Sequence, residues 1–275
     1  MTIATTPAMD RATSLRAVVR MTGWTGLAII LVIVSMSEFL ASAPADTQNL
    51  GPALAAPSAQ FFFGTDLLGR DVLSETLHAL RETTGEAMIA ALVAIIAGGL
   101  FGFVAARLPR KAGIGLRWAV GILAAAPVLL LAILFIAIAG REWASFAAGL
   151  AGAPIAFVRA YDRTRAESFT RYAEYARATG IAAATLLRRD LVYEFRDSFF
   201  VTAARALAAT TITLSTASFL GFVAVPPNRD LGLMIAAAKI SYLQAWWTAA
   251  FPALALLLLI LCARLAAGLE DGERP

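Results

Sequence analysis

The sequence predicts an all-α integral membrane protein with six transmembrane helices, and three observations carry this prediction. Of its 275 residues, 59% are hydrophobic, whereas soluble domains contain about 45–50% apolar residues. Apolar runs recur at about 20 residues, the length that an α-helix needs to cross a bilayer. The arginines gather in a few connecting segments. By the positive-inside rule these segments face the cytoplasm, which explains the net charge of +4 without a nucleic-acid partner.

The chain begins with a polar segment at residues 1–20, which we expect in the cytoplasm, followed by a first transmembrane helix at 21–41. The Ala-Ser-Ala at 41–43 resembles the exit of a cleaved signal peptide, but the apolar run before it is longer than such peptides have. Glu38 lies near the outer end of this helix. It either reaches the membrane interface or lines a pore.

Residues 42–86 are too polar to cross a membrane and are expected on the extracytoplasmic side. Within them, apolar residues recur at helical spacing over 71–81, which predicts a short amphipathic helix. Five further transmembrane helices are expected at 87–106, 118–139, 143–158, 198–223 and 248–267.

Two of these helices contain residues that predict how the helix packs or bends. Gly98 and Gly102 have the small-xxx-small spacing that lets a neighbouring helix approach closely. Pro127 is expected to kink the third helix, because proline removes one backbone hydrogen bond.

The fifth transmembrane helix is unusually rich in hydroxyl groups. They either line a water-filled path for a polar solute or bond back to the carbonyl four residues earlier. Arg205 is expected to reach back to the inner interface. The candidates for a translocation path are Thr210, Thr213, Ser215, Thr216 and Ser218.

The last third of the chain adds one irregular segment. Residues 231–245 are moderately apolar and are expected to form a re-entrant or interfacial helix. Trp246 and Trp247 follow, and adjacent tryptophans are typical of the outer membrane interface.

The most charged part of the chain is the loop at 159–197, with eight arginines and six acids among its 39 residues. One charge at the bilayer centre costs about 2.5–3.5 kcal/mol, so this loop lies in water or against a protein. It contains no proline and is rich in Ala, Leu, Arg and Glu, which favour helix. These properties predict a helical cytoplasmic element that docks onto a soluble partner.

Signals for catalysis and for metal binding are lacking in the sequence. It contains no GxxxxGK[ST] phosphate loop and no GxSxG elbow. One histidine, His78, and one cysteine, Cys262, are too few for a His/Cys metal site. We therefore expect no catalytic residues, no bound metal and no cofactor in this chain. The sequence favours a protein that conducts a solute over an enzyme.

One segment carries a family resemblance. FGTDLLGRD at 63–71 is similar to the GTDxxGRDxxSR pattern in the second membrane subunit of bacterial ABC importers for dipeptides, oligopeptides and nickel. The family's arginine after the serine is Glu75 here. The matching residues are Gly64, Thr65, Asp66, Gly69, Arg70, Asp71 and Ser74.

The charged loop and the C-terminal third resemble the same family. In the family an EAA-type loop forms a helix that sits in a cleft of the ATPase subunit, and Glu174, Ala176 and Gly180 fall in its register. The later matches are SFLG at 218–221, the double proline at 226–227 and Phe-Pro at 251–252. The Leu-Pro that usually follows the EAA helix is Val192-Tyr193 here. The residues that the resemblance assigns to ATPase coupling are Glu174, Tyr175, Ala176, Arg177, Thr179 and Gly180.

The resemblance implies a MetI-like ABC importer permease in the bacterial inner membrane, with both termini in the cytoplasm and a five-helix core at 87–275. A helix at 174–187 would couple it to the ATPases. The implied partners are a homologous second permease, two ATPase subunits that bind ATP and Mg, an extracytoplasmic solute-binding protein and membrane lipid. The implied cargo is a peptide-like solute; nickel, a metal chelate or an opine-like conjugate is the alternative.

Two functions of other classes stay open on the residues alone. An ion-coupled secondary transporter would need carboxylates within its helices or an inverted repeat. A membrane scaffold that transports nothing would need neither.

Overall fold

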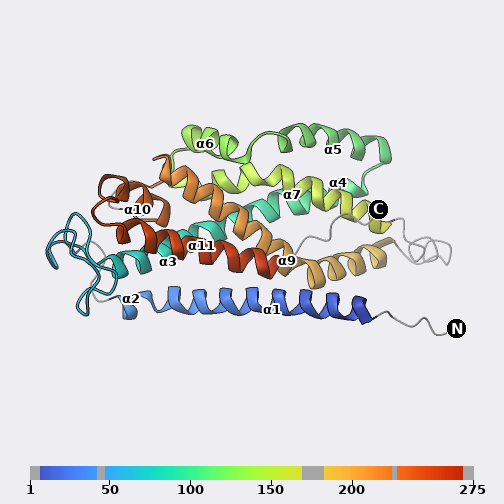
Figure 1. The fold of residues 1–275 in the computed structure, drawn as a ribbon. Helices are drawn as coiled ribbons and strands as arrows, with labels where there is room; N and C mark the ends of the chain where they lie inside the picture. The colour runs from blue at the N-terminus through green and yellow to red at the C-terminus, as the bar shows by residue number, and fades with distance from the viewer. Residues whose placement is uncertain (1–6, 42–46, 169–182, 225–227, 269–275) are drawn as a thin grey trace. The chain divides into compact units, whose positions relative to one another are not determined.

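The computed structural model describes residues 7–41, 47–168, 183–224 and 228–268. The chain divides into two compact units, one made of residues 1–84 and 225–275 and the other of residues 85–224. All regular elements among the described residues are helices (Figure 1). The prediction of an all-α protein is therefore confirmed.

The first unit is assembled from both ends of the chain, and its long helices α1 and α11 lie side by side (Figure 1). Glycines allow this close approach: a Cβ at Gly23 would overlap the backbone of Ala266, and one at Gly26 would lie 2.5 Å from the sulfur of Cys262. Helix α3 begins in this unit and ends in the second. The elements are α1 (Pro7–Ser35), α2 (Ser37–Leu40), the start of α3 (Val72–Ala94), α10 (Leu231–Ala237), the 3₁₀ helix η3 (Ala238–Ile240) and α11 (Trp247–Ala267).

The second unit is built around α7, which packs against most of the other helices of the unit. Gly98 and Gly102 lie where the chain before α5 meets α7, and a Cβ on either would overlap backbone atoms of α7. The predicted small-residue contact is confirmed. The elements after α3 are the π-helix η1 (Ile95–Leu100), α4 (Phe101–Arg107), α5 (Arg110–Ala124), α6 (Val128–Ala139), the 3₁₀ helix η2 (Arg141–Trp143), α7 (Ala144–Ser168) and α9 (Ala183–Phe219).

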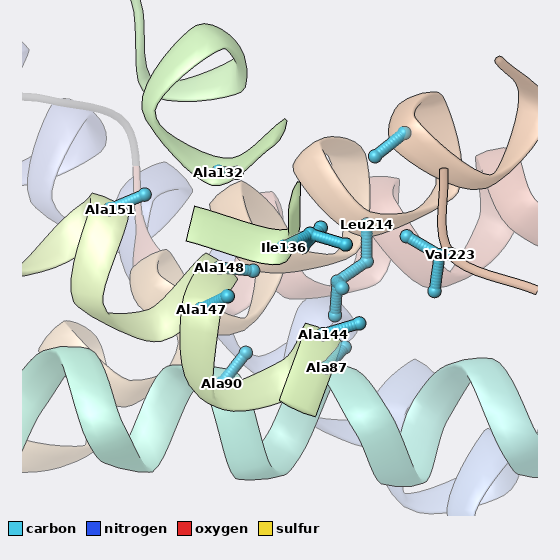
Figure 2. Packing of buried hydrophobic residues seen from close by; sticks show 11 residues of the cluster. Ala87, Ala90, Ala132, Ile136, Ala144, Ala147, Ala148, Ala151, Leu214 and Val223 are labelled. Carbon is cyan, nitrogen blue, oxygen red and sulfur yellow. The ribbon is translucent and has the colours of Figure 1, made fainter. Parts of the chain in front are cut away.

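Small side chains dominate the core of the second unit (Figure 2). Alanines of α3, α6 and α7 face one another there, and Ile136 and Leu214 fill the space between them. Because an alanine extends little from its backbone, the helices approach closely and gain contact along their length.

Two expected helices differ from those observed. The separate helix expected over 71–81 is the first part of α3, which runs on without a break. The third transmembrane helix is not kinked at Pro127 but broken there, with 86° between α5 and α6. Pro127 stands just before α6, where its missing N–H disrupts no helical bond.

The expected count of six spans is not confirmed by the described part of the chain. Among the described residues, four helices are long and apolar enough to cross a membrane, or five if α5 and α6 form one broken span. The four spans are Ala17–Ser35, Val72–Arg107, Arg141–Arg165 and Trp247–Ala267.

The helices of the second unit continue into the charged loop. The expected fourth helix at 143–158 extends in α7 to Ser168, through Pro154. On the other side α9 already begins at Ala183. The missing Leu-Pro at Val192-Tyr193 explains why the helix is not interrupted before the apolar part.

Candidate functional site

The GTDxxGRD segment folds into a tight turn that depends on its two glycines. Gly64 and Gly69 have φ of 72° and 67°, a region that disfavours side chains. A Cβ on Gly64 would also lie 2.6 Å from the carbonyl oxygen of Ala55, and one on Gly69 would overlap the carbonyl oxygen of Gly51. Both positions therefore require glycine for space as well as for backbone conformation.

Thr65 joins the turn to the loop that precedes it. Its buried hydroxyl donates to the carbonyl of Pro52 at 2.6 Å and accepts from the N–H of Ala55 at 2.8 Å. Its carbonyl accepts from the indole N–H of Trp247 at 3.1 Å. One residue thus connects the loop to the start of α11.

Asp66 closes the turn. Its Oδ1 accepts from the N–H groups of Leu68 and Arg70, both at 2.9 Å. Its Oδ2 accepts from Nε of Arg70 at 2.6 Å. The Arg70 side chain is thereby held in one orientation.

Asp71 stands immediately before α3 and caps it. Its Oδ2 accepts from the backbone N–H of Ser74 at 3.2 Å and from the Ser74 hydroxyl at 2.7 Å. A carboxylate at a helix start also interacts well with the helix dipole. Six of the seven matching motif residues, all but Ser74, therefore lie in one turn, and each has a role in building it.

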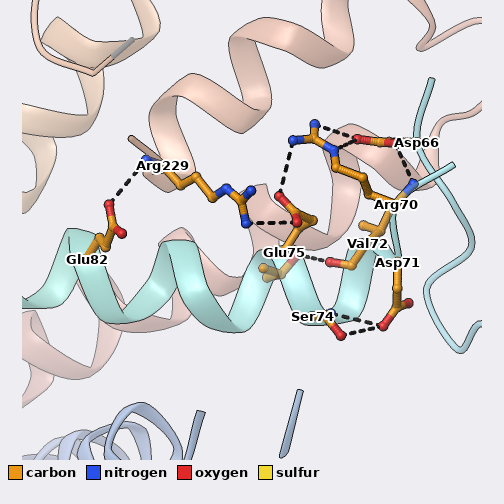
Figure 3. A network of polar contacts seen from close by, with 9 residues as sticks. Asp66, Arg70, Asp71, Val72, Ser74, Glu75, Glu82 and Arg229 are labelled. Atoms are coloured by element: carbon orange, nitrogen blue, oxygen red, sulfur yellow. Dashed lines mark hydrogen bonds and ion pairs between the residues drawn. The ribbon is translucent and has the colours of Figure 1, made fainter. Parts of the chain in front are cut away.

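A chain of alternating charges extends from this turn (Figure 3). Arg70 contacts Asp66 at 2.6 Å and Glu75 at 3.5 Å. Glu75 also accepts from Nη1 of Arg229 at 2.9 Å, and the two side chains are 6% and 7% exposed. Glu75 and Arg229 are separated by 154 positions in sequence, so this buried pair fixes a distant segment to α3.

Backbone contacts strengthen the same junction. The N–H of Arg229 donates to Glu82 at 3.2 Å, and that of Leu231 donates to the hydroxyl of Thr83 at 3.0 Å. Asp230 caps α10 by accepting from the N–H of Leu233 at 2.9 Å. The polar residues of α3 thus find partners inside the protein, which explains why α3 begins at 72 despite its polar start. Sequence reasoning did not identify Arg229 or Glu82 as members of this network.

An apolar cluster closes the first unit beside this network. Val72, Ala245 and Trp247 are its buried members, and the rings of Phe63 and Phe251 stack at 3.9 Å. The prediction that Trp247 is an interfacial anchor is wrong, because its hydrogen bond to Thr65 holds the indole inside the protein. We define the GTD network as Thr65, Asp66, Arg70, Asp71, Glu75, Arg229 and Trp247.

Glu38 forms an exposed ion pair with Arg81, and its carboxylate is 66% exposed. The hydrogen bond from Arg81, followed by the attraction of its charge, holds the pKa of Glu38 below its ordinary value. This exposure matches the interfacial alternative for Glu38. Within the part of the chain that the structure describes, no group of His, Cys, Asp or Glu is arranged to hold a metal ion.

The hydroxyls of α9 lie mostly inside the second unit. Thr210 donates to the carbonyl of Ala87 at 2.9 Å and shares its hydrogen with earlier carbonyls of its own helix. Thr213 donates to the carbonyl four residues earlier at 3.0 Å. Ser215 and Ser218 are buried, and Thr216 is half-buried. Bonding within the helix is thus observed for two of the candidates, and their place on a translocation path stays a prediction.

The ATPase-coupling residues are not tested by the structure. They lie outside the described residues, between the end of α7 and the start of α9. The residues concerned are Glu174, Tyr175, Ala176, Arg177, Thr179 and Gly180.

Comparison with known proteins gives a consistent result. No protein-family model matches the chain. The chain is 32% identical over 228 residues to the di/tripeptide transport system permease protein DppC of Pseudomonas aeruginosa, covering 81% of this chain and 74% of the relative. It is 31% identical over 266 residues to the peptide transport system permease protein SapC of Escherichia coli, covering 94% and 88%. The SapC protein of Haemophilus influenzae is 30% identical over 247 residues, covering 86% and 83%.

Proposed function

Because this chain belongs to the peptide transport system permeases, multi-pass membrane subunits of bacterial ABC importers, we propose that it forms half of an ATP-driven import path for peptides. The observation that carries this proposal is similarity to such permeases along most of the chain. The relatives are named for peptides and for di- or tripeptides. Their names favour a peptide over nickel, a metal chelate or an opine-like conjugate as the cargo here.

The partners follow from this role. ABC importers of this kind work with ATPase subunits and with a solute-binding protein. We propose a homologous second permease as the other half of the path, so that the membrane part is a heterodimer. ATP and Mg belong to the ATPase subunits, since this chain has no phosphate-binding loop.

The orientation that we propose has both termini in the cytoplasm. The arginine-rich 159–197 loop is then cytoplasmic, as the positive-inside rule requires. The GTD network is extracytoplasmic, on the side from which a binding protein delivers solute.

The coupling that we propose runs through the two long helices of the second unit. Residues 169–182, which contain Glu174 and Gly180, connect α7 to α9, and these helices pack against each other. Helix α9 continues for 37 residues, about 55 Å at 1.5 Å per residue. A displacement imposed by the ATPase at one end of such a helix moves the other end, which suits rigid-body alternating access.

The proposal is tested on the assembled transporter in proteoliposomes. Radiolabelled dipeptide should accumulate with ATP inside and binding protein outside. Glu174→Arg and Gly180→Trp should each release the ATPase subunits or abolish peptide-stimulated ATP hydrolysis. Glu142→Arg, the same charge reversal in the short connection between α6 and α7, should leave both unchanged.

Three results would contradict the proposal. Unchanged assembly and coupling in both loop variants would remove the coupling assignment. Uptake that survives ATP depletion but stops with an uncoupler would indicate an ion-coupled transporter. A complex that moves no peptide and retains no ATPase would indicate a scaffold.

A further inference from the structure

Two separate hydrophobic cores lie at different levels of α7 in the second unit. One is the alanine-rich core of Figure 2, to which α7 contributes buried alanines between 144 and 151. The other contains Phe157 and Tyr161 of α7 together with Ala105 and Ala106 of α4. Between the two levels, the α7 residues at 152–156 are half-buried and belong to neither core.

Three interruptions of regular α-helix fall between these cores. The π-helix η1 separates the alanines that α3 gives to the first core from those that α4 gives to the second. Pro154 lies within the 152–156 interval of α7. The 86° break lies between α5, whose Val120 packs against the second core, and α6, which belongs to the first. Helices bend at prolines and at π-helical turns, so this boundary is the weakest level of the unit.

The irregular segments of α7 and η1 touch each other. A Cβ on Gly98 would overlap the carbonyl oxygen of Ala153, so the two backbones are in direct contact beside Pro154. Because proline has no N–H, α7 lacks one helical hydrogen bond there. A Cβ on Gly99 or Gly152 would meet its nearest neighbour only at 3.8 or 3.6 Å, which leaves room for movement around the contact.

On one side of the boundary, polar contacts join α5 to the end of α7. Arg117 donates from Nε and Nη2 to the two carboxylate oxygens of Asp162, at 2.6 and 2.8 Å. Arg165 donates to the carbonyl of Leu108, between α4 and α5, at 3.3 Å. A bidentate pair of this kind fixes orientation as well as distance. We define the loop-side body as α4, α5 and residues 157–168, because α7 leads from here into the charged loop.

On the other side, close contacts join α3, α6, α7 and α9. Thr210 of α9 donates to the carbonyl of Ala87 at 2.9 Å. A Cβ on Gly149 of α7 would lie 2.6 Å from the carbonyl oxygen of Ala90. Ile136 of α6 fills the space between the helices. We define the far body as residues 87–94, α6, residues 144–151 and residues 207–223.

We propose that the second unit bends at this boundary, with Gly98 against Ala153 as the pivot, so that the loop-side body swings as one piece against the far body. From Pro154 to Arg165 α7 rises about 16 Å. A bend of about 20° at the boundary would therefore displace the Arg165 end by about 6 Å. The alanine-rich core stays packed during this movement. The bend does not depend on what the chain transports, whereas its drive by an ATPase through the charged loop rests on the proposed function.

The test measures distances between pairs of spin labels by double electron–electron resonance. The full chain is held in nanodiscs on a Cys262→Ala background, with labelled molecules diluted by unlabelled ones. Labels are attached to cysteines introduced at exposed positions. Leu108→Cys with Phe146→Cys spans the boundary. The pairs within one body are Leu108→Cys with Ile122→Cys and Leu130→Cys with Phe146→Cys.

The distance distribution across the boundary should be at least about twofold wider than either distribution within a body, since only that pair contains the bend. Pro154→Ala with Gly99→Ala should narrow it, because alanine restores the missing N–H and favours α-helix. Gly115→Ala with Pro252→Ala, the same two changes away from the boundary, should leave it unchanged. In the assembled transporter, trapping with ATP and vanadate should shift the mean distance across the boundary by about 3–6 Å.

Three outcomes overturn the bend. The distribution across the boundary is as narrow as those within the bodies, or it stays equally wide after the stiffening changes, or the pairs within one body are as widely distributed as the pair across it. A transporter that hydrolyses ATP in response to peptide without the shift removes the link to the ATPase. A chain that binds no ATPase contradicts the proposed function, and the distributions of the isolated chain still decide whether the second unit bends.

Discussion

Replacing Arg229 by glutamine should destabilise the first unit strongly, because it leaves the Glu75 carboxylate buried with a weaker partner. Removing one partner of a buried ion pair costs about 3–5 kcal/mol. Arg70 remains 3.5 Å from Glu75 and offsets part of this cost. We therefore expect Arg229→Gln to lower the free energy of unfolding by about 2–4 kcal/mol.

A double-mutant cycle separates the pair from its surroundings. Glu75→Gln together with Arg229→Gln places two neutral groups opposite each other, and their amides can still bond. The double variant should be more stable than the sum of the single effects predicts, by about 1–3 kcal/mol. Unfolding by dodecyl sulfate in mixed micelles, followed by tryptophan fluorescence, measures all three variants.

The control for this cycle is Arg81→Gln. Its ion pair with Glu38 is exposed, and exposed pairs contribute little because water competes with them. The reasoning is refuted if Arg229→Gln is no more damaging than Arg81→Gln, or if the effects of the two single variants at 75 and 229 simply add.

Three further predictions follow from other parts of the molecule. Gly102→Ala should lower the free energy of unfolding by about 1–3 kcal/mol, because the added Cβ would overlap a backbone carbonyl oxygen of α7. Gly115→Ala, which has open space around it, should be neutral or stabilising. Equal melting temperatures for the two variants would contradict the packing. Thr65→Val should lower the free energy of unfolding by about 1–3 kcal/mol, because the backbone N–H of Ala55 loses its acceptor. If the turn survives, the tryptophan emission should not shift to shorter wavelength. An unchanged melting temperature would argue against this hydrogen bond. The pKa of Glu38 is lowered in the folded state, so its pair with Arg81 stabilises above the ordinary pKa and is lost as pH falls through the lowered value. The difference in melting temperature between the natural chain and Glu38→Gln should therefore shrink below the ordinary pKa of 4.5, and a difference that grows there would reverse the sign of this argument.

The parts of the fold that follow from local sequence were predictable. The last span was expected at 248–267 and is Trp247–Ala267, because a long apolar run ends at Gly268. The contact at Gly98 and Gly102 was predictable from spacing alone. The turn at 64–71 was expected as a motif, although its two glycines give no sign of which carbonyls they approach.

The features that depend on distant residues were not predictable. Proline at 127 indicates a disturbed helix, but the angle at the break depends on how α6 packs against α7. Trp246 and Trp247 are equivalent in a hydropathy profile, and the hydrogen bond to Thr65 decides which of them is buried. Arg229 gains its role from Glu75, and nothing in one sequence indicates that these two positions meet.

The assembly of the first unit from both ends of the chain has a consequence for biogenesis. Residues 1–84 leave the ribosome first, but α11 is synthesised last. At about 5–20 residues per second, α1 waits on the order of 10–40 s in the membrane before its glycine face meets α11. During that interval Glu75 also lacks Arg229. A chain that stalls or is truncated after the second unit would therefore present an unpaired glycine surface on α1, and Glu75 would have Arg70 but not Arg229 as an ion-pair partner.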